Sequence, residues 1–325
     1  MTKTILVTGG TGLVGSAVKE MSSKNDDSFS LDINSQDPKD NFIFVNSKDY
    51  DLSSWEDTTR MFEKYKPTHV IHLAACVGGL FKNMNNKVNM LERNLMMNYN
   101  VVKCCHQYQV TKLVACLSTC VFPDKTTYPI DETMLHNGPP HESNDSYAYA
   151  KRMLEIHCKA YRENYGCDFV CVIPTNIYGP RDNYSLEDGH VIPSLIHKCY
   201  LAKQKGCDFV VRGTGKPLRQ FIYSLDLGEL LLWVLQNKTE PSIILSVSEK
   251  EEVTIEYVAR LIASNFDYED RIVFDSSFAD GQYKKTADNS KLMEKLDNSF
   301  TFTTIEHGIK NSVAWFIDNY NQSRK

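Results

Sequence analysis

A glycine-rich loop between a strand and a helix restricts the fold of this chain more than any other feature. The apolar run Thr4–Val7 leads into Gly9-Gly10-Thr11-Gly12-Leu13-Val14-Gly15, and the apolar residues from Leu13 to Met21 recur at helical spacing. The first glycine of such a loop permits a tight turn, the second lets a diphosphate approach the backbone, and the third lets the helix pack closely on the sheet. The helix N-terminus then offers N–H groups to phosphate. The loop predicts a dinucleotide site with Gly9, Gly12, Leu13, Val14 and Gly15 as cofactor-binding residues.

Strands and helices alternate over the first half of the chain. The β-prone runs that follow the glycine loop are Phe42–Val45, Thr68–Ala75, Leu113–Ser118 and Asp168–Ile173. Helical stretches cover about 91–107 and 149–165. This alternation is typical of an α/β protein with a Rossmann-type doubly wound parallel sheet and right-handed crossovers.

After Pro174 the alternation stops, and turns, short strands and a helix at Val191–Lys203 follow. We therefore expect a smaller, interleaved C-terminal substrate-binding domain. The predicted boundaries are 1–177 plus about 216–246 for the Rossmann domain, and about 178–215 with 247–325 for the substrate-binding domain. The polar stretch 22–40 is expected to be a surface loop.

The composition excludes several classes of protein. The formal net charge is −5, which gives no basic surface for nucleic acid. No run of about 20 apolar residues is present, so we expect no membrane-spanning helix. The start of the chain lacks the pattern of a secretion signal, and the ten cysteines are scattered. These features predict a reduced, cytoplasmic protein.

The choice between NAD and NADP depends on which segment forms the second strand. If Ser28–Ile33 is that strand, Asp32 near its end suits a ribose 2′-hydroxyl and favours NAD. If Phe42–Val45 is that strand, it ends at Ser47 and Lys48, which suit a 2′-phosphate. The second run is more apolar and more β-prone, so we expect NADPH/NADP+ as cofactor. Asp51 and Leu52, shortly after, are then expected near the adenine.

A second group of residues suits carbonyl chemistry. Ser118 ends a predicted strand, and Tyr147 and Lys151 lie four residues apart, so they share one face of a helix. A neighbouring ammonium favours the phenolate and lowers the pKa of a tyrosine. Such a tyrosine can protonate an alkoxide as a hydride reaches the carbonyl carbon. Ser118 can donate a hydrogen bond to the same oxygen.

The glycine loop, Ser118, Tyr147 and Lys151 together resemble the extended short-chain dehydrogenase/reductase family. More narrowly, several motifs in order resemble the GDP-L-fucose synthase family. They are His72-Leu73-Ala74-Ala75-Cys76-Val77-Gly78-Gly79-Leu80, Ser118-Thr119-Cys120-Val121-Phe122-Pro123, Pro174-Thr175-Asn176-Ile177-Tyr178-Gly179-Pro180, Asp188-Gly189-His190-Val191-Ile192-Pro193 and Gly281-Gln282-Tyr283-Lys284-Lys285-Thr286. The similarity runs through essentially the whole chain.

This resemblance implies a bifunctional enzyme with one site for two reactions. GDP-4-keto-6-deoxy-D-mannose is epimerised at C3 and C5, and its C4 ketone is then reduced by NADPH to give GDP-L-fucose. The resemblance adds Cys120 and His190 as the acid/base pair of the epimerisation. Inversion needs a proton removed from one face and returned on the other, and a thiol and an imidazole can exchange these roles near neutral pH. We expect Cys120 to be the base and His190 the acid.

The resemblance also implies further contacts to the ligands. Pro174, Asn176 and His190, with Tyr147 and Lys151, are expected near the cofactor. The residues expected near the substrate are Asn176, Lys198, Arg212, Arg219 and Lys285. Arg212 stands where the family commonly has tryptophan, so a planar cation replaces an aromatic surface.

Two other functions remain open from the sequence. One is another nucleotide-sugar enzyme with bound NAD, such as a 4-epimerase or a 4,6-dehydratase. Thr119-Cys120 stands where dehydratases typically place an acidic pair, which counts against the second. The other is a non-catalytic, cofactor-sensing protein, against which the retained Tyr147 and Lys151 argue. We expect no metal, and a homodimer formed by the apolar faces of the helices near 91–107 and 149–165.

Overall fold

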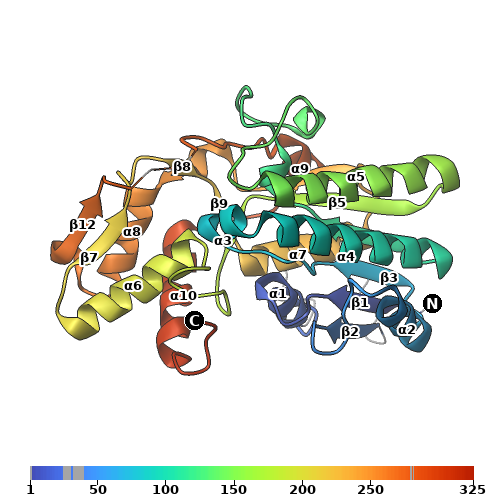
Figure 1. Cartoon of the computed structure of the whole chain (residues 1–325), viewed down its shortest axis with the longest axis horizontal. Helices are drawn as coiled ribbons and strands as arrows, with labels where there is room; N and C mark the ends of the chain where they lie inside the picture. Colours follow the sequence, from blue (N-terminus) through green and yellow to red (C-terminus); the bar gives the residue numbers. More distant parts are fainter. Residues whose placement is uncertain (1, 25–30, 32–39, 279, 281) are drawn as a thin grey trace.

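A parallel sheet of six strands forms the centre of the N-terminal part of the protein (Figure 1). The computed structural model describes residues 2–24, 31, 40–278, 280 and 282–325. The strands, in spatial order, are β10 (Ser242–Leu245), β5 (Asp168–Pro174), β4 (Lys112–Cys116), β3 (His69–His72), β1 (Thr4–Thr8) and β2 (Asn41–Val45). From β1 the chain passes to β2 on one side and then crosses to β3 on the other. The carboxyl ends of β1 and β3 therefore border the crevice where doubly wound sheets bind ligands.

Helices cover both faces of this sheet, as the apolar strands require. One apolar core lies between the sheet and α2, α4 and α5, and a second lies between the sheet and α1, α7 and α9. The helices are α1 (Leu13–Met21), α2 (Trp55–Tyr65), α4 (Lys87–Gln107), α5 (Asp145–Tyr165), α7 (Ser224–Gln236) and α9 (Ser290–Lys295). The predicted doubly wound α/β fold is confirmed.

Two predicted strands end earlier than the sequence suggests. β3 stops at His72, and beyond it the Ala74 N–H donates to the Thr8 side chain, at Oγ1, at 3.2 Å. β4 stops at Cys116, two residues before Ser118. The second strand is β2, which pairs with β1 in parallel, so Phe42–Val45 is confirmed. Asp32 lies outside the described residues.

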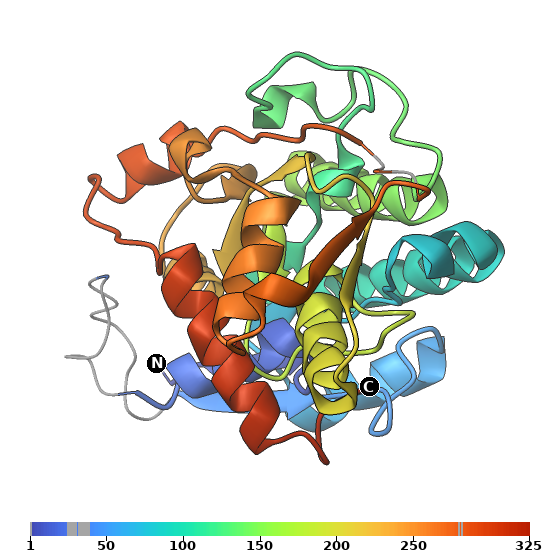
Figure 2. The same ribbon diagram turned by 90° about the vertical axis from the view of Figure 1, so that its left-hand side faces the viewer.

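The C-terminal part packs around a third apolar core, formed mainly by three helices and short strand pairs (Figure 2). The helices are α6 (Val191–Lys205), α8 (Ile255–Ser264) and α10 (Ile305–Asp318). The paired strands are β6 (Asn176–Tyr178) with β9 (Phe221–Tyr223), β7 (Phe209–Arg212) with β12 (Ile272–Asp275), and β8 (Leu218–Arg219) with β11 (Val253–Thr254). The predicted domain boundaries stay a prediction.

Short helical segments complete the described part of the chain. They are α3 (Leu80–Asn85), η2 (Thr119–Val121), η3 (Glu132–Met134), η4 (Glu249–Glu251) and η5 (Glu269–Arg271). Among the helices described here, none is long and apolar enough to cross a membrane.

Candidate active site

The glycine loop has the backbone geometry of a diphosphate cradle. Gly9 lies in the left-handed region with φ +69°, where its missing side chain avoids strain. A Cβ atom at Gly15 would lie 2.7 Å from Gly10 Cα, so the helix rests against the loop itself. A Cβ atom at Gly10 would lie 2.7 Å from Phe44 Cβ on β2, a contact that the sequence did not indicate.

The start of α1 is suited to an anion. The helix begins at Leu13, so the N–H groups of Leu13, Val14 and Gly15 have no partner within the helix. The first turn holds no acidic residue. A dinucleotide diphosphate fits these donors.

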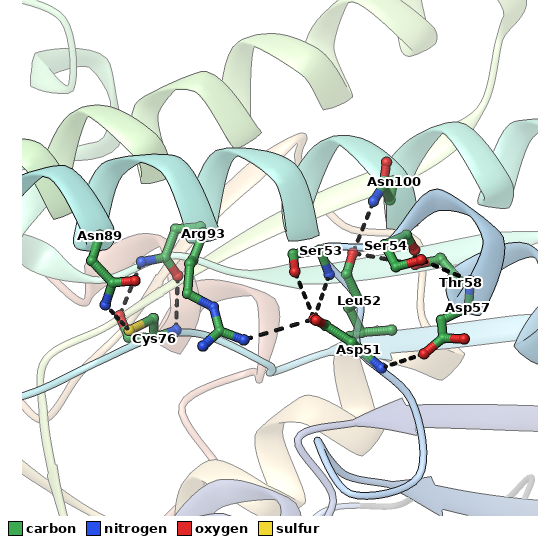
Figure 3. Close-up of polar contacts among 11 residues, drawn as sticks. Asp51, Leu52, Ser53, Ser54, Asp57, Thr58, Cys76, Asn89, Arg93 and Asn100 are labelled. Carbon is green, nitrogen blue, oxygen red and sulfur yellow. Dashed lines mark hydrogen bonds and ion pairs between the residues drawn. The ribbon is translucent and has the colours of Figure 1, made fainter.

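The end of β2 carries the residues expected near the adenosine (Figure 3). Ser47 and Lys48 are exposed in a turn in which Asn46 Oδ1 accepts from the Lys48 N–H at 2.8 Å. The Asp51 carboxylate accepts from Ser53 Oγ at 2.6 Å and lies 3.7 Å from an Arg93 nitrogen on α4. The hydrogen bonds from Ser53 hold the pKa of Asp51 below its ordinary value.

Leu52 has a structural role in the same turn. Its side chain is buried, and its carbonyl oxygen accepts from Asn100 Nδ2 at 2.9 Å and from Thr58 Oγ1 at 3.2 Å (Figure 3). These bonds attach the turn to α4 and α2.

A tight turn after β4 holds Ser118 and Cys120. Ser118 precedes η2 and its Oγ accepts from the Cys120 N–H at 3.4 Å. The Cys120 side chain is buried. Burial raises the pKa of the Cys120 thiol, while the Lys285 ammonium, the Ser118 hydroxyl and the Lys151 ammonium lower it. The thiol, the hydroxyl and two cations therefore belong to one site.

Tyr147 and Lys151 lie one turn apart on α5 and face this segment. Lys151 Nζ donates to the carbonyl oxygen of Cys116 at 2.8 Å and lies 5.8 Å from the centre of the Tyr147 ring. The expectation that Lys151 lowers the pKa of Tyr147 is wrong for this structure. Burial raises the pKa of Tyr147 well above its ordinary value, and the thiols of Cys120, Cys116 and Cys76 act in the same direction. Tyr147 is thus a protonated phenol near neutral pH.

His190 lies directly before α6. It is exposed and makes no capping hydrogen bond to the described residues of that helix. Enclosure by the surrounding protein lowers the pKa of His190. The preceding loop contacts the loop after β3, because the Gly79 N–H donates to the Asp188 carbonyl at 3.0 Å.

Cys76, on the loop after β3, lies within electrostatic reach of Tyr147, which the sequence reasoning did not indicate. Asn94 on α4 holds its backbone, since Asn94 Oδ1 accepts from the Cys76 N–H at 2.9 Å and Asn94 Nδ2 donates to the Cys76 carbonyl at 2.9 Å. The only sequence signal was its place in the motif that follows β3.

Pro174 and Asn176 lie where the chain leaves the large sheet. Pro174 is the last residue of β5, and Asn176 begins β6. The Asn176 side chain is exposed, and its Nδ2 donates to the Gln220 carbonyl at 2.9 Å. This bond ties the end of β5 to the segment before β9.

The four expected phosphate- and base-binding cations fall into two groups. Lys198 on α6 and Arg212 on β7 are near enough for their charges to repel, which with burial lowers the pKa of Lys198. The Arg212 guanidinium lies 4.6 Å from the centre of the Phe278 ring, so it stacks on an aromatic side chain. Lys285 and Arg219 form the second group, and burial with mutual repulsion lowers the pKa of Lys285.

Arg219 also has a structural task that the sequence did not indicate. Its guanidinium donates to the carbonyl oxygens of Leu218 at 2.7 Å and Gln282 at 2.6 Å. It thereby holds the segment that leads to Lys285. Among the described residues, no cluster of three or more His, Cys, Asp or Glu side chains has a geometry that could hold a metal ion.

Comparisons with known proteins show the family of this chain. Residues 5–247 match the NAD dependent epimerase/dehydratase family. The chain is 56% identical over 324 residues to the GDP-L-fucose synthase of Dictyostelium discoideum, which covers 99% of this chain and 98% of that one. It is 50% identical over 333 residues to the probable GDP-L-fucose synthase of Drosophila melanogaster, with 99% of this chain and 100% of that one covered.

A solved structure extends the comparison to the fold. The crystal structure of a GDP-L-fucose synthetase from Naegleria fowleri bound to NADP superposes with a TM-score of 0.90 at 50% identity, over 100% of this chain and 97% of that one. The protein therefore belongs to the NAD dependent epimerase/dehydratase family and, within it, to the GDP-L-fucose synthases.

Proposed function

We propose that this protein converts GDP-4-keto-6-deoxy-D-mannose to GDP-L-fucose by 3,5-epimerisation followed by NADPH-dependent reduction at C4. One observation carries the proposal: Ser118 and Cys120 share a turn that faces Tyr147 and Lys151 on α5. A reductase alone needs only the hydroxyl, the phenol and the lysine. A thiol in the same enclosed site supplies the extra acid/base group that an epimerisation requires.

The epimerisation depends on the ketone that flanks both stereocentres. Removal of the proton from C3 or C5 gives an enolate whose charge spreads onto the C4 oxygen. Ser118 and Tyr147 hydroxyls, held at the end of β4 and on α5, can donate hydrogen bonds to that oxygen. Cys120 as base and His190 as acid then take a proton from one face and return one to the other.

The reduction uses the same oxygen contacts. NADPH bound on the glycine loop supplies a hydride to the sugar C4 atom. As the alkoxide forms, Tyr147 gives its phenolic proton to the oxygen. Because burial keeps the phenol protonated, this proton is available across the neutral pH range. Lys151 positions the segment that carries Ser118 through its bond to the Cys116 carbonyl.

The preference for NADPH is supported by the end of β2. Lys48 and Ser47 are exposed there, beside the strand that follows the glycine loop. An ammonium and a hydroxyl suit a ribose 2′-phosphate. Lys198, Arg212, Arg219 and Lys285 provide the positive charge for the GDP diphosphate and base.

We also propose that the active form is a homodimer. Large apolar side chains are exposed on α4 and α5, which pack side by side (Figure 1). They are Val88, Met96, Tyr99, Tyr149, Met153 and Ile156. A second copy of the same helix pair would bury this surface in a four-helix interface.

All ten cysteines are free thiols, which supports the cytoplasm as the site of action. Cell fractionation with an antibody to the protein tests this. Recovery in a membrane or secreted fraction would contradict it.

The test of the function follows NADPH absorbance with purified protein and GDP-4-keto-6-deoxy-D-mannose, with product analysis and NADH in parallel. NADPH oxidation with formation of GDP-L-fucose is the expected result. If no NADPH is consumed and the protein purifies with NAD, another nucleotide-sugar enzyme is the better assignment.

Cys120→Ser should abolish deuterium exchange from solvent into C3 and C5 while NADPH still binds.

A further inference from the structure

Two consecutive residues of α5 hold the segment that carries Ser118 and Cys120. Lys151 Nζ donates to the carbonyl oxygen of Cys116, before the turn, at 2.8 Å. Arg152 Nε donates to the carbonyl oxygen of Val121, at the end of the turn, at 2.6 Å. Both reactive side chains lie between these two anchors. The helix that supplies Tyr147 thus also determines the position of the turn.

A buried arginine such as Arg152 is an unusual side chain for holding a single carbonyl oxygen. Its side chain is 8% exposed, and Nη2 has no hydrogen-bond partner among the described residues. A buried cation costs several kcal/mol unless it is fully paired. A neutral donor would satisfy one carbonyl oxygen at a smaller cost. The charge of Arg152 therefore calls for an explanation beyond the bond to Val121.

The surroundings of Arg152 place this charge beside the Cys120 turn. Its guanidinium lies 5.6 Å from the centre of the Tyr149 ring, which covers one side. Cys120 is within electrostatic reach of the guanidinium, and it also faces the Lys285 and Lys151 ammonium groups and the Ser118 hydroxyl, which lower its pKa. Arginine remains charged where burial favours neutral lysine, so it can provide a permanent positive charge there.

We propose that Arg152 is a positioning residue for Cys120: its Nε sets the orientation of the turn through Val121, and its buried guanidinium stabilises the sulfur as it loses its proton. This inference rests on the proposed function, in which Cys120 acts as the base of the epimerisation. The proton goes to the partner acid/base group or to water, and no oxidant or reductant is involved. Arg152 itself touches neither substrate nor cofactor in this proposal.

Arg162 provides a matched control on the same helix. Its Nη1 donates to the carbonyl oxygen of Phe169 at 2.6 Å, and Nη2 lies 3.5 Å from a Glu155 carboxylate oxygen. It is therefore another arginine of α5 that anchors a carbonyl, but it does so at the far end of the helix, near the start of β5. Loss of such an anchor should lower stability without acting on Cys120.

The first measurement is the pH dependence of Cys120 alkylation by iodoacetamide in the free protein, followed by peptide mass spectrometry. For Arg152→Met we expect the midpoint to rise by about one pH unit, since a stabilising charge is lost. Arg152→Lys should give a midpoint between those of the wild type and Arg152→Met, because burial favours the neutral form of lysine. Arg162→Met should leave it unchanged even if its thermal midpoint falls. Equal midpoints in the wild type and Arg152→Met would overturn the charge role.

The second measurement is deuterium exchange from solvent into C3 and C5 of the substrate, with NADPH affinity measured alongside. Arg152→Met should slow exchange by at least about tenfold with unchanged NADPH affinity. Arg152→Lys, which lacks the planar donor, should also slow exchange and provides the test if Arg152→Met does not fold. Normal exchange in Arg152→Lys would overturn the positioning role. Absence of exchange in the wild type, with a shifted alkylation midpoint in Arg152→Met, would instead refute the proposed function alone.

Discussion

The Thr8 hydroxyl donates a hydrogen bond to His72 Nδ1 at 2.8 Å. The direction follows from Asn98 Oδ1 on α4, an amide oxygen that can only accept and lies 3.1 Å from His72 Nε2. The neutral His72 ring therefore carries its proton on Nε2, and Nδ1 is the acceptor. The neutral ring therefore connects β1, β3 and α4 beneath the glycine loop, and a second proton on Nδ1 would break the bond to Thr8.

This relationship predicts an acid-sensitive fold. Burial lowers the pKa of His72 to about 3, far below the ordinary value of about 6.5. In this pH range the unfolded chain binds a proton on His72 and the folded chain does not. The free energy of unfolding therefore falls as pH decreases from about 6.5 towards 3. Between pH 7 and 5 this loss amounts to about 2 kcal/mol.

Urea unfolding of His72→Gln should show a change in the free energy of unfolding between pH 7 and 5 that is smaller by that amount. His307→Gln, at an exposed position on α10, is the control and should follow the wild type. Parallel curves for wild type and His72→Gln would contradict the prediction.

The pH dependence of exchange distinguishes the roles of Cys120 and His190. Burial raises the pKa of Cys120, so the thiolate fraction grows about tenfold per pH unit below that pKa. If Cys120 is the base, exchange into the substrate should rise steadily from pH 7 to 9. The pKa of His190 is lowered, so its neutral form already dominates at pH 7, and His190 as the acid would act through its minor protonated form. A flat profile over this range would assign the base to His190 instead.

Tyr147→Phe should impair reduction more than exchange. In the proposed mechanism the protonated phenol supplies the proton to the C4 alkoxide, so its loss should slow NADPH oxidation by about a hundredfold or more. Exchange at C3 and C5 should fall less, because the mechanism leaves the Ser118 hydroxyl as a donor to the enolate oxygen. Single-turnover NADPH oxidation and deuterium incorporation measure the two steps separately. Equal losses would mean that Tyr147 chiefly stabilises the enolate.

Gly15→Ala should damage the cofactor site. The added Cβ atom would lie 2.7 Å from Gly10 Cα, and the helix start would have to move away from the loop. We expect a loss of about 1–3 kcal/mol in stability and weaker NADPH binding by isothermal titration. Gly206→Asn is the control, because Gly206 has φ +64° and open space around it, and asparagine tolerates this conformation. Native NADPH affinity in Gly15→Ala would show that the loop does not hold the diphosphate.

Met153→Glu should convert a dimer to a monomer. The residue is 50% exposed on the α4–α5 surface, and a carboxylate there would be buried in the proposed interface. Light scattering after size exclusion at micromolar protein measures the mass. Val273→Glu, at an exposed position on β12, should leave the dimer intact. A monomeric wild type would refute the proposed interface.

Local patterns in the sequence were sufficient for the fold class and much of the site. The glycine spacing located the turn after β1, and apolar runs located the strands to within a few residues, because buried parallel strands need continuous apolar sequence. The helical spacing of Tyr147 and Lys151 placed both side chains on one face, since positions four apart adjoin on any helix.

Other features of the fold and the site could not be predicted from local sequence patterns and were found only in the tertiary structure. Lys151 bonds to the Cys116 carbonyl, and Arg219 holds the Gln282 carbonyl, because segments distant in sequence present those oxygens to them. The Ala74 N–H, just beyond β3, donates to Thr8, which lies 66 residues away in the sequence. The raised pKa of Tyr147 likewise follows from burial by the assembled protein. The elements and the reactive groups they carry follow from local patterns, because periodicity and turn chemistry act over a few residues. The partner of each long polar side chain follows from the fold, because packing selects which distant backbone groups come within its reach.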